Sequence, residues 1–239
     1  MRTVKILNLY GEALGLNGEE KGLVAVCQRL EEMGYKAEVS EQGIGDDLCL
    51  DGFDLVFMTH GKPQNVSALS GHFGRYKNEI LNYIESGRPM VVTGSANMLL
   101  GKSFSMLDGK KYEGIGLLDC VAEEFDSLYV SDAVLSPDFA PEEKFFGCFY
   151  RCESVTYEKP EEHPLFRVLK ADPGEGCVAG WEGVHYKNLF ATWCLGPVLV
   201  RNPSMMREVL KATLGEDYKE TDFSLEERAL RQILKDMGQ

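Results

Sequence analysis

The sequence of 239 residues has no long apolar run and no excess of positive charge. No stretch approaches the ~18 apolar residues that a transmembrane helix needs, so we expect no membrane span. Asp and Glu number 38 against 25 Lys and Arg, a formal net charge of −13, which argues against binding nucleic acid or an anionic membrane through a broad positive surface. Residues 1–8 lack the apolar core of a signal peptide, and a cytoplasmic protein is expected.

The sequence also lacks the residue spacings of common metal and disulfide sites. Its four histidines form no His-x-x-x-His set, and its cysteines form no C-x-x-C pair. The seven cysteines are scattered at positions 27, 49, 120, 148, 152, 177 and 194. An odd, scattered set is typical of reduced thiols in a reducing compartment, and we predict no metal site.

The N-terminal part of the chain alternates strand and helix patterns. Strands are predicted over residues 4–9, 35–39, 54–59 and 90–93, and helices over 19–33, 76–85 and 96–100. The run D-L-V-F-M-T at 54–59 is almost continuously apolar, as expected for a strand covered on both faces. This alternation predicts an α/β fold: a doubly wound, mostly parallel sheet of the flavodoxin-like type between two helical layers.

The pattern changes further along the chain. Alternating segments between 129 and 157 predict strands at the edge of the sheet or an antiparallel extension of it. The remaining predicted elements are a buried strand over 188–193, helices over 205–214 and from 224 to about 235, and a capping box in S-L-E-E at 224–227. We therefore predict one domain over residues 1–214, with 215–239 as its C-terminal helical extension.

Three segments are expected at the carboxyl ends of the parallel strands, where open sheets bind ligands: 59–62, 93–97 and 193–197. In the middle segment a buried strand ends at Gly94-Ser95 and runs directly into a helix. This is the geometry of a nucleophile elbow, although Thr93 and Asn97 stand where the G-x-S-x-G motif has glycines. Ser95 as an ordinary helix cap is an equally open interpretation.

Four segments together resemble the class I glutamine amidotransferase domains of the cobyric acid synthase type. They are N-L-Y-G-E at 8–12, V-T-G-S at 92–95 followed by L-L-G at 99–101, G-I-G-L-L-D at 114–119, and A-T-W-C-L-G-P-V-L-V-R-N-P at 191–203. The last segment is similar, without a gap, to the family pattern G-T-Y-L-H-G-P-L-L-x-x-N-P. The resemblance extends to about residue 214 and is most apparent with glutaminase subunits of the lipid II isoglutaminyl synthase type.

The resemblance implies a set of catalytic positions. In such enzymes a cysteine at the elbow attacks the side-chain amide of glutamine, and a histidine transfers the proton. By resemblance, the cysteine position falls on Ser95 and the histidine position on Leu195. The two glycines that follow the nucleophile fall on Ala96 and Asn97, and the oxyanion loop falls on 59–61, where Gly61 is kept.

The resemblance also implies binding positions and a partner. Substrate or oxyanion contacts are expected at Gly61, Gly94 and Ala96, and an arginine position falls near Leu128 or Tyr129. The family's chemistry needs no organic cofactor or metal in this domain. In enzymes of this family, the ammonia released from glutamine passes to an ATP-dependent amide synthetase. For the lipid II isoglutaminyl synthase type, that synthetase is similar to the Mur ligases.

The replaced residues predict a loss of glutaminase activity. A serine hydroxyl is a much weaker nucleophile than a thiolate near neutral pH and depends on a positioned base. Leu195 cannot accept a proton. We therefore expect that the domain is retained as a subunit that binds a small amide or amino-acid ligand, or that docks on the synthetase.

Other residues are weaker candidates for the missing roles. His60, in the loop beside the elbow, is the best candidate for a substitute base. His185 follows a glycine-rich segment, whereas His72 and His163 are in contexts typical of a surface. Cys194 is expected to point away from the site, because adjacent strand residues face opposite ways.

Two alternative functions stay open. The first is an active glutaminase subunit that delivers ammonia to a synthetase with altered catalytic groups. The second is a serine hydrolase that uses Ser95, because residues 94–97 partly resemble the elbow of dipeptidase E-like proteins.

Overall fold

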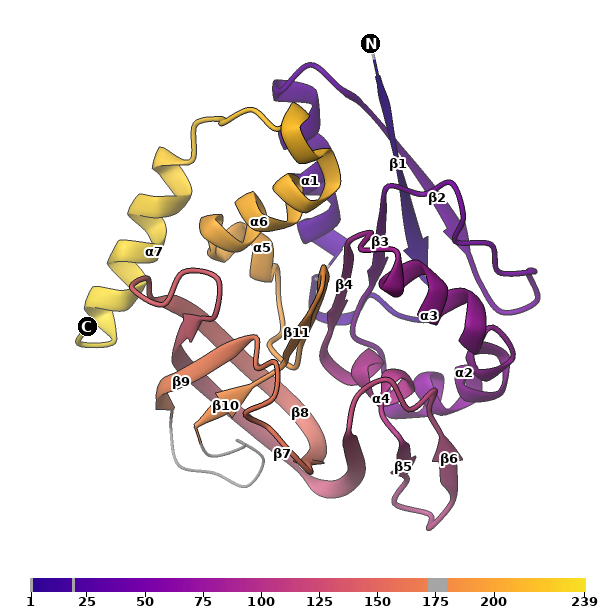
Figure 1. Ribbon diagram of the computed structural model, residues 1–239. Helices are drawn as coiled ribbons and strands as arrows, with labels where there is room; N and C mark the ends of the chain where they lie inside the picture. Colours follow the sequence, from indigo (N-terminus) through magenta and orange to yellow (C-terminus); the bar gives the residue numbers. More distant parts are fainter. Residues whose placement is uncertain (1, 19, 172–179) are drawn as a thin grey trace.

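The computed structural model describes residues 2–18, 20–171 and 180–239 (Figure 1). Two predicted features, the helix start at Glu19 and the thiol of Cys177, lie outside these residues.

The first sheet is mostly parallel, as predicted. Its strands are β1 (Thr3–Leu9), β2 (Lys36–Gln42), β3 (Leu55–Met58), β4 (Met90–Thr93), β11 (Val184–Tyr186) and β12 (Leu189–Thr192). Their order is β11-β12-β4-β3-β1-β2, and β11 is antiparallel to β12. Every residue of β3, β4 and β12 is buried, because helices cover both faces of these strands.

Helices form a layer on each side of this sheet (Figure 1). One layer contains α1 (Glu20–Glu32), α5 (Val198–Arg201) and α6 (Pro203–Leu214), and the other contains α2 (Pro63–Arg75), α3 (Lys77–Glu85) and α4 (Asn97–Leu100). Helix α1 buries Leu23, Val26 and Leu30, the spacing of one helical face. The doubly wound α/β fold is therefore confirmed.

A second sheet lies beside the first. Its strands are β5 (Ser103–Ser105), β6 (Lys111–Glu113), β7 (Cys120–Pro137), β8 (Phe145–Tyr157), β9 (Phe166–Ala171) and β10 (Trp181–Glu182). Strands β7 and β8 form a long antiparallel hairpin in which Val130 pairs with Tyr150. Residues 129–157 were predicted as strands at the edge of the first sheet or as an antiparallel extension of it. Both placements were wrong, because these strands pair with one another and with β5 and β9 in a separate sheet.

Three further features differ from the sequence-based expectations. Helix α2 was not predicted, and His72 lies buried in its last turn rather than on a surface. The His72 imidazole bonds through Nδ1 to the Tyr10 hydroxyl at 2.8 Å. Helix α7 (Ser224–Asp236) forms without the predicted capping box, because Ser224 is already helical and its N–H donates to Asp222 Oδ1 at 2.9 Å. Within the described ranges, no helix combines the length and apolar character of a membrane span.

Candidate functional site

The chain turns sharply between β4 and α4, at the carboxyl edge of the first sheet. Thr93 is extended (φ −121°), and the short 3-10 turn Gly94–Ala96 follows it. Gly94 has a φ of 58°, in the left-handed region that glycine adopts without a steric penalty. The Asn97 amide Nδ2 donates to Gly94 O at 2.9 Å and to Thr192 O at 2.8 Å, which holds this corner against the end of β12.

Gly94, rather than Ser95, is the left-handed residue of this corner. In a nucleophile elbow the strained turn residue is the nucleophile itself, and its side chain points out of the turn. A Cβ atom at Gly94 would lie 2.5 Å from Leu195 Cδ2 and 2.6 Å from His60 Nδ1. A side chain at position 94 would therefore face Leu195. Position 94 lies one residue before Ser95, to which the resemblance assigned the cysteine.

The Ser95 side chain is 1% exposed and is held by the loop that follows β3. Its hydroxyl donates to Gly61 O at 2.6 Å and accepts the Gly61 N–H at 3.2 Å. His60 Nδ1 lies 3.0 Å from the same oxygen and accepts the Ser95 N–H at 3.1 Å. The structure thus brings Ser95, His60 and Gly61 together. The N–H groups of Ser95 and Gly61, which an oxyanion would need, are already hydrogen-bonded within the protein.

His60 is a weak base in this position. Its side chain is buried, and burial lowers the pKa of the imidazole to about 4. Because Nδ1 accepts the Ser95 N–H, the proton of the neutral ring is on Nε2. A general base works best with a pKa near the operating pH, so this imidazole is poorly matched to proton abstraction at neutral pH.

The other predicted binding residues lie in a closed junction. Leu195 is 3% exposed, and its N–H donates to Cys148 O on β8 at 2.7 Å. Ala96 is fully buried. A Cβ atom at Gly61 would lie 2.4 Å from Leu14 Cδ2, so a larger residue at position 61 would require the Leu14 side chain to move.

Buried charged residues of the second sheet, which sequence reasoning missed, lie next to this junction. Arg151 and Glu153 occupy the buried face of β8, and the Arg151 guanidinium lies 5.8 Å from the Trp193 ring centroid. The Glu182 carboxylate accepts the Trp193 N–H at 2.6 Å and the Thr192 hydroxyl at 2.8 Å. The period-two spacing of β8 places Arg151 and Glu153 on the same face as Phe149, and this spacing is the sequence signal by which these two residues could have been found.

These two carboxyl groups are strongly perturbed. Burial raises the pKa of Glu153 to about 7 and that of Glu182 to about 7. Among the described residues, neither oxygen of the Glu153 carboxyl has a hydrogen-bond partner. Tyr129, near which the resemblance places an arginine, pairs across the strands with Arg151.

The remaining candidates lie apart from the corner or are unsuited to catalysis. His185 Nδ1 lies 2.7 Å from Asp138 Oδ2, and His163 is exposed. Cys194 is buried, and burial raises the pKa of its thiol well above the ordinary range. Within the part of the chain that the structure describes, no three His, Cys, Asp or Glu side chains group as metal ligands.

Comparisons with known proteins complete the description of the site. Residues 15–203 match the CobB/CobQ-like glutamine amidotransferase domain. The chain is 24% identical over 217 residues to "Lipid II isoglutaminyl synthase (glutamine-hydrolyzing) subunit GatD" of Streptococcus pneumoniae (strain ATCC BAA-255 / R6), covering 90% of this chain and 82% of the relative. It is also 24% identical over 202 residues to the subunit of the same name from Staphylococcus aureus (strain N315), covering 84% and 81%.

Solved structures show the same fold at low sequence identity. A structure of PurLQS from Thermotoga maritima has a TM-score of 0.56 at 13% identity and covers 98% of this chain and 100% of that chain. A glutamine amidotransferase from Thermotoga maritima has a TM-score of 0.54 at 14% identity, with coverage of 98% and 94%.

Proposed function

The chain belongs to the CobB/CobQ-like glutamine amidotransferase family, and from this premise we propose that it is a member without glutaminase activity. It serves as a subunit that binds a small amide or amino-acid ligand or docks on an ATP-dependent amide synthetase. The observation that carries the proposal is that Gly94 occupies the left-handed position of the corner, where a side chain would face Leu195.

Hydrolysis of an amide by this family's chemistry needs a nucleophile at the corner and a base that faces it. Gly94 has no side chain, so no attacking atom stands at the strained position. Leu195, the residue that a side chain at 94 would face, has no atom that accepts a proton. When a nucleophile and its base are both absent, the expected loss of rate is several orders of magnitude.

Ser95 is a poor replacement for the missing nucleophile. Its hydroxyl is buried and donates to the Gly61 carbonyl, so an attack would first have to break a bond of 2.6 Å. Its own N–H and that of Gly61 are also engaged and cannot hold an oxyanion in this arrangement. These bonds support a structural role for the serine.

The role as a subunit is supported by the two relatives, whose names describe a subunit of a glutamine-hydrolyzing synthase. For this chain we propose docking on a synthetase that receives no ammonia from it. The preserved fold supports retention for docking, and the closed corner argues against hydrolysis there.

The test is an ammonia-release assay on the purified full chain with L-glutamine, with and without the synthetase partner. We expect no release above the enzyme-free blank from the wild type, from Ser95→Ala or from His60→Gln, while a glutamine-hydrolyzing relative assayed in parallel is active. Glutamine-dependent ammonia release by the wild type would overturn the proposal. If Ser95→Ala abolished that release, the active-glutaminase alternative would be correct.

One observation favours a second candidate, a serine hydrolase: His60 Nδ1 lies 3.0 Å from Ser95 Oγ. A fluorophosphonate probe labels a serine only when the hydroxyl is activated and accessible. Labelling of the wild type that is absent from Ser95→Ala would establish this candidate. We expect no labelling, because the hydroxyl is buried.

A further inference from the structure

Helix α7 (Ser224–Asp236) runs along one side of the molecule, past α5, to the second sheet (Figure 1). It lies outside residues 15–203, which match the family domain. No residue of α7, all of which the structure describes, is fully buried, and Leu225 is 66% exposed. A helix that buries so little surface can detach at a lower free energy than the unfolding of the whole domain.

The N-terminal end of α7 is anchored to the helices of the first sheet. The Phe223 ring is 3% exposed and lies between two guanidinium groups, that of Arg29 at 4.3 Å and that of Arg207 at 4.4 Å from its centroid. Arg29 of α1 also pairs with Glu226, and Arg207 of α6 pairs with Glu227 at 2.7 Å. Both ion pairs are partly exposed, so each contributes only a modest free energy to this anchor.

The C-terminal end of α7 is attached to the second sheet. Lys170 Nζ, on β9, donates to Met237 O at 2.8 Å. Lys144 Nζ, just before β8, donates to Gln239 Oε1 at 3.1 Å. Between its two ends α7 contacts both α5 and β8. This one helix therefore bridges the two sheets.

The two elements that α7 contacts, α5 and β8, meet at a joint between the sheets. The Leu195 N–H donates to Cys148 O at 2.7 Å. The Phe146 N–H donates to Asn202 Oδ1 at 2.9 Å, and Asn202 Nδ2 donates to Phe146 O at 3.0 Å. These three bonds, which we call the joint, hold the edge of β8 on the segment 195–202. Because β8 also contacts the turn Gly94–Ala96, the joint keeps the corner closed.

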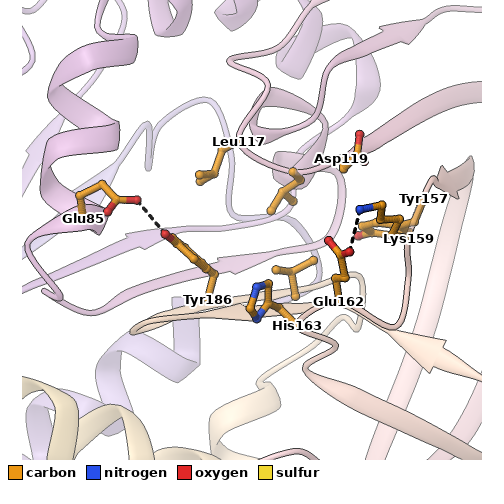
Figure 2. A pocket seen from close by; sticks show the side chains of 10 residues that line it. Glu85, Leu117, Asp119, Tyr157, Lys159, Glu162, His163 and Tyr186 are labelled. Atoms are coloured by element: carbon orange, nitrogen blue, oxygen red, sulfur yellow. Dashed lines mark hydrogen bonds and ion pairs between the residues drawn. The ribbon is translucent and has the colours of Figure 1, made fainter.

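A second connection between the sheets has room for movement. Strand β10 continues into β11 through Gly183 alone, at a φ of 68°, so the chain passes from one sheet to the other in a single residue. Beside it is a cavity of about 280 Å³, lined by Glu85 and Tyr186 on the side of the first sheet and by Lys159 and Glu162 on the side of the second (Figure 2). Glu85 bonds to Tyr186, and Lys159 pairs with Glu162, so both contacts stay on one side of the cavity. This arrangement is suited to a hinge at Gly183.

We propose that α7 is a releasable strap that controls access to the Gly94 corner. While α7 is docked, it holds the edge of β8 on the segment 195–202, and the corner is closed. When α7 detaches, the second sheet turns about Gly183, the joint opens, and the corner becomes accessible to a ligand. This inference goes beyond the proposed function and does not depend on whether the chain hydrolyses glutamine.

The experiment is hydrogen exchange of the backbone amides of the full chain at pH 7, followed by 1H–15N NMR. The N–H groups of Leu195 and Phe146 report on the joint, and the N–H of Val91, in the centre of the first sheet, reports on global unfolding. After correction for intrinsic rates, we expect the two joint amides of the wild type to exchange at least tenfold faster than Val91, because release of the strap opens them first. Joint amides as well protected as Val91 would overturn the proposal.

Two double variants of equal net charge test the coupling between α7 and the joint. Glu226→Gln with Glu227→Gln removes both ion pairs of the N-terminal anchor. We expect the amides of α7 and of Leu195 to exchange about fivefold faster in this variant, by the same factor. The control, Glu161→Gln with Glu216→Gln, replaces two exposed acids away from α7 and is expected to leave both rates within twofold. Faster exchange in α7 without a change at Leu195, or equal effects of the two double variants, would refute the strap.

Discussion

Replacement of the buried Glu153 is expected to change how the stability of the protein depends on pH. The Glu153 side chain is 0% exposed, and among the described residues neither carboxyl oxygen has a hydrogen-bond partner. Burial raises its pKa from about 4.5 to about 7, while the nearby Arg151 opposes this shift. The folded protein therefore holds the Glu153 proton more tightly than the unfolded chain does.

The sign and size of the effect follow from this difference in pKa. Below pH 4.5 both states are protonated, and the contribution of Glu153 to stability is fully present. As the pH rises toward 7, the unfolded chain loses its proton first, so the free energy of unfolding falls. With ~1.36 kcal/mol for each pH unit between the two pKa values, the loss is about 3 kcal/mol, complete just above pH 7.

Glu153→Gln removes this loss, because the amide stays neutral at every pH. Urea unfolding of both proteins at pH 4.5, 6, 7 and 8 measures the free energy of unfolding. We expect the variant to gain about 3 kcal/mol on the wild type between pH 4.5 and pH 8. Glu123→Gln, an exposed acid on β7, is the matched control and is expected to give no such gain. Parallel curves for wild type and Glu153→Gln would refute the reasoning.

Three further changes test the corner. Gly94→Ala is expected to destabilise the protein by about 3 kcal/mol or more, because it combines a left-handed φ with contacts below 3 Å. The control is Gly109→Ala, outside the corner, where φ is also positive but no atom would contact the new Cβ, and it is expected to cost only about 1 kcal/mol. Equal losses of unfolding free energy for the two variants in urea would show that the close contacts at Gly94 do not add to the cost. Asn97→Ala loses two hydrogen bonds to backbone carbonyls and is expected to cost about 2 kcal/mol, which thermal unfolding measures. His60→Gln is expected to gain stability relative to the wild type as the pH falls from 6.5 to 4, since the buried imidazole resists the proton that the unfolded chain accepts; a constant difference over this range would refute the lowered pKa.

Much of the first sheet could be predicted from local patterns. The apolar runs at 54–59 and 90–93 correspond to β3 (Leu55–Met58) and β4 (Met90–Thr93), because a strand buried on both faces must be apolar throughout. Helix α2 was missed because Gly71 and Gly74 in its interior weaken its helical signal. The packing of its apolar face, which includes Val66 and Phe73, stabilises it nonetheless.

The placement of the second sheet depended on contacts between distant parts of the chain. The alternation between 129 and 157 indicates strands, but it does not indicate which strands they pair with. The hairpin of β7 and β8 pairs further with β5 and β9, and these pairings exist only in the folded chain. For the same reason the buried face of β8, with Arg151, was not recognised as a neighbour of Trp193, which follows β12.

The sequence by itself determined the fold class, the family and the place of the corner, because apolar periodicity and short motifs are local properties of a chain. Only the tertiary structure decided which residue of that corner is strained. The left-handed φ belongs to Gly94. A Cβ atom at Gly94 would point toward Leu195, because β4 and β12 lie side by side. It also decided that the Ser95 hydroxyl is enclosed by the 60–61 loop, since those hydrogen bonds join segments 34 and 35 residues apart.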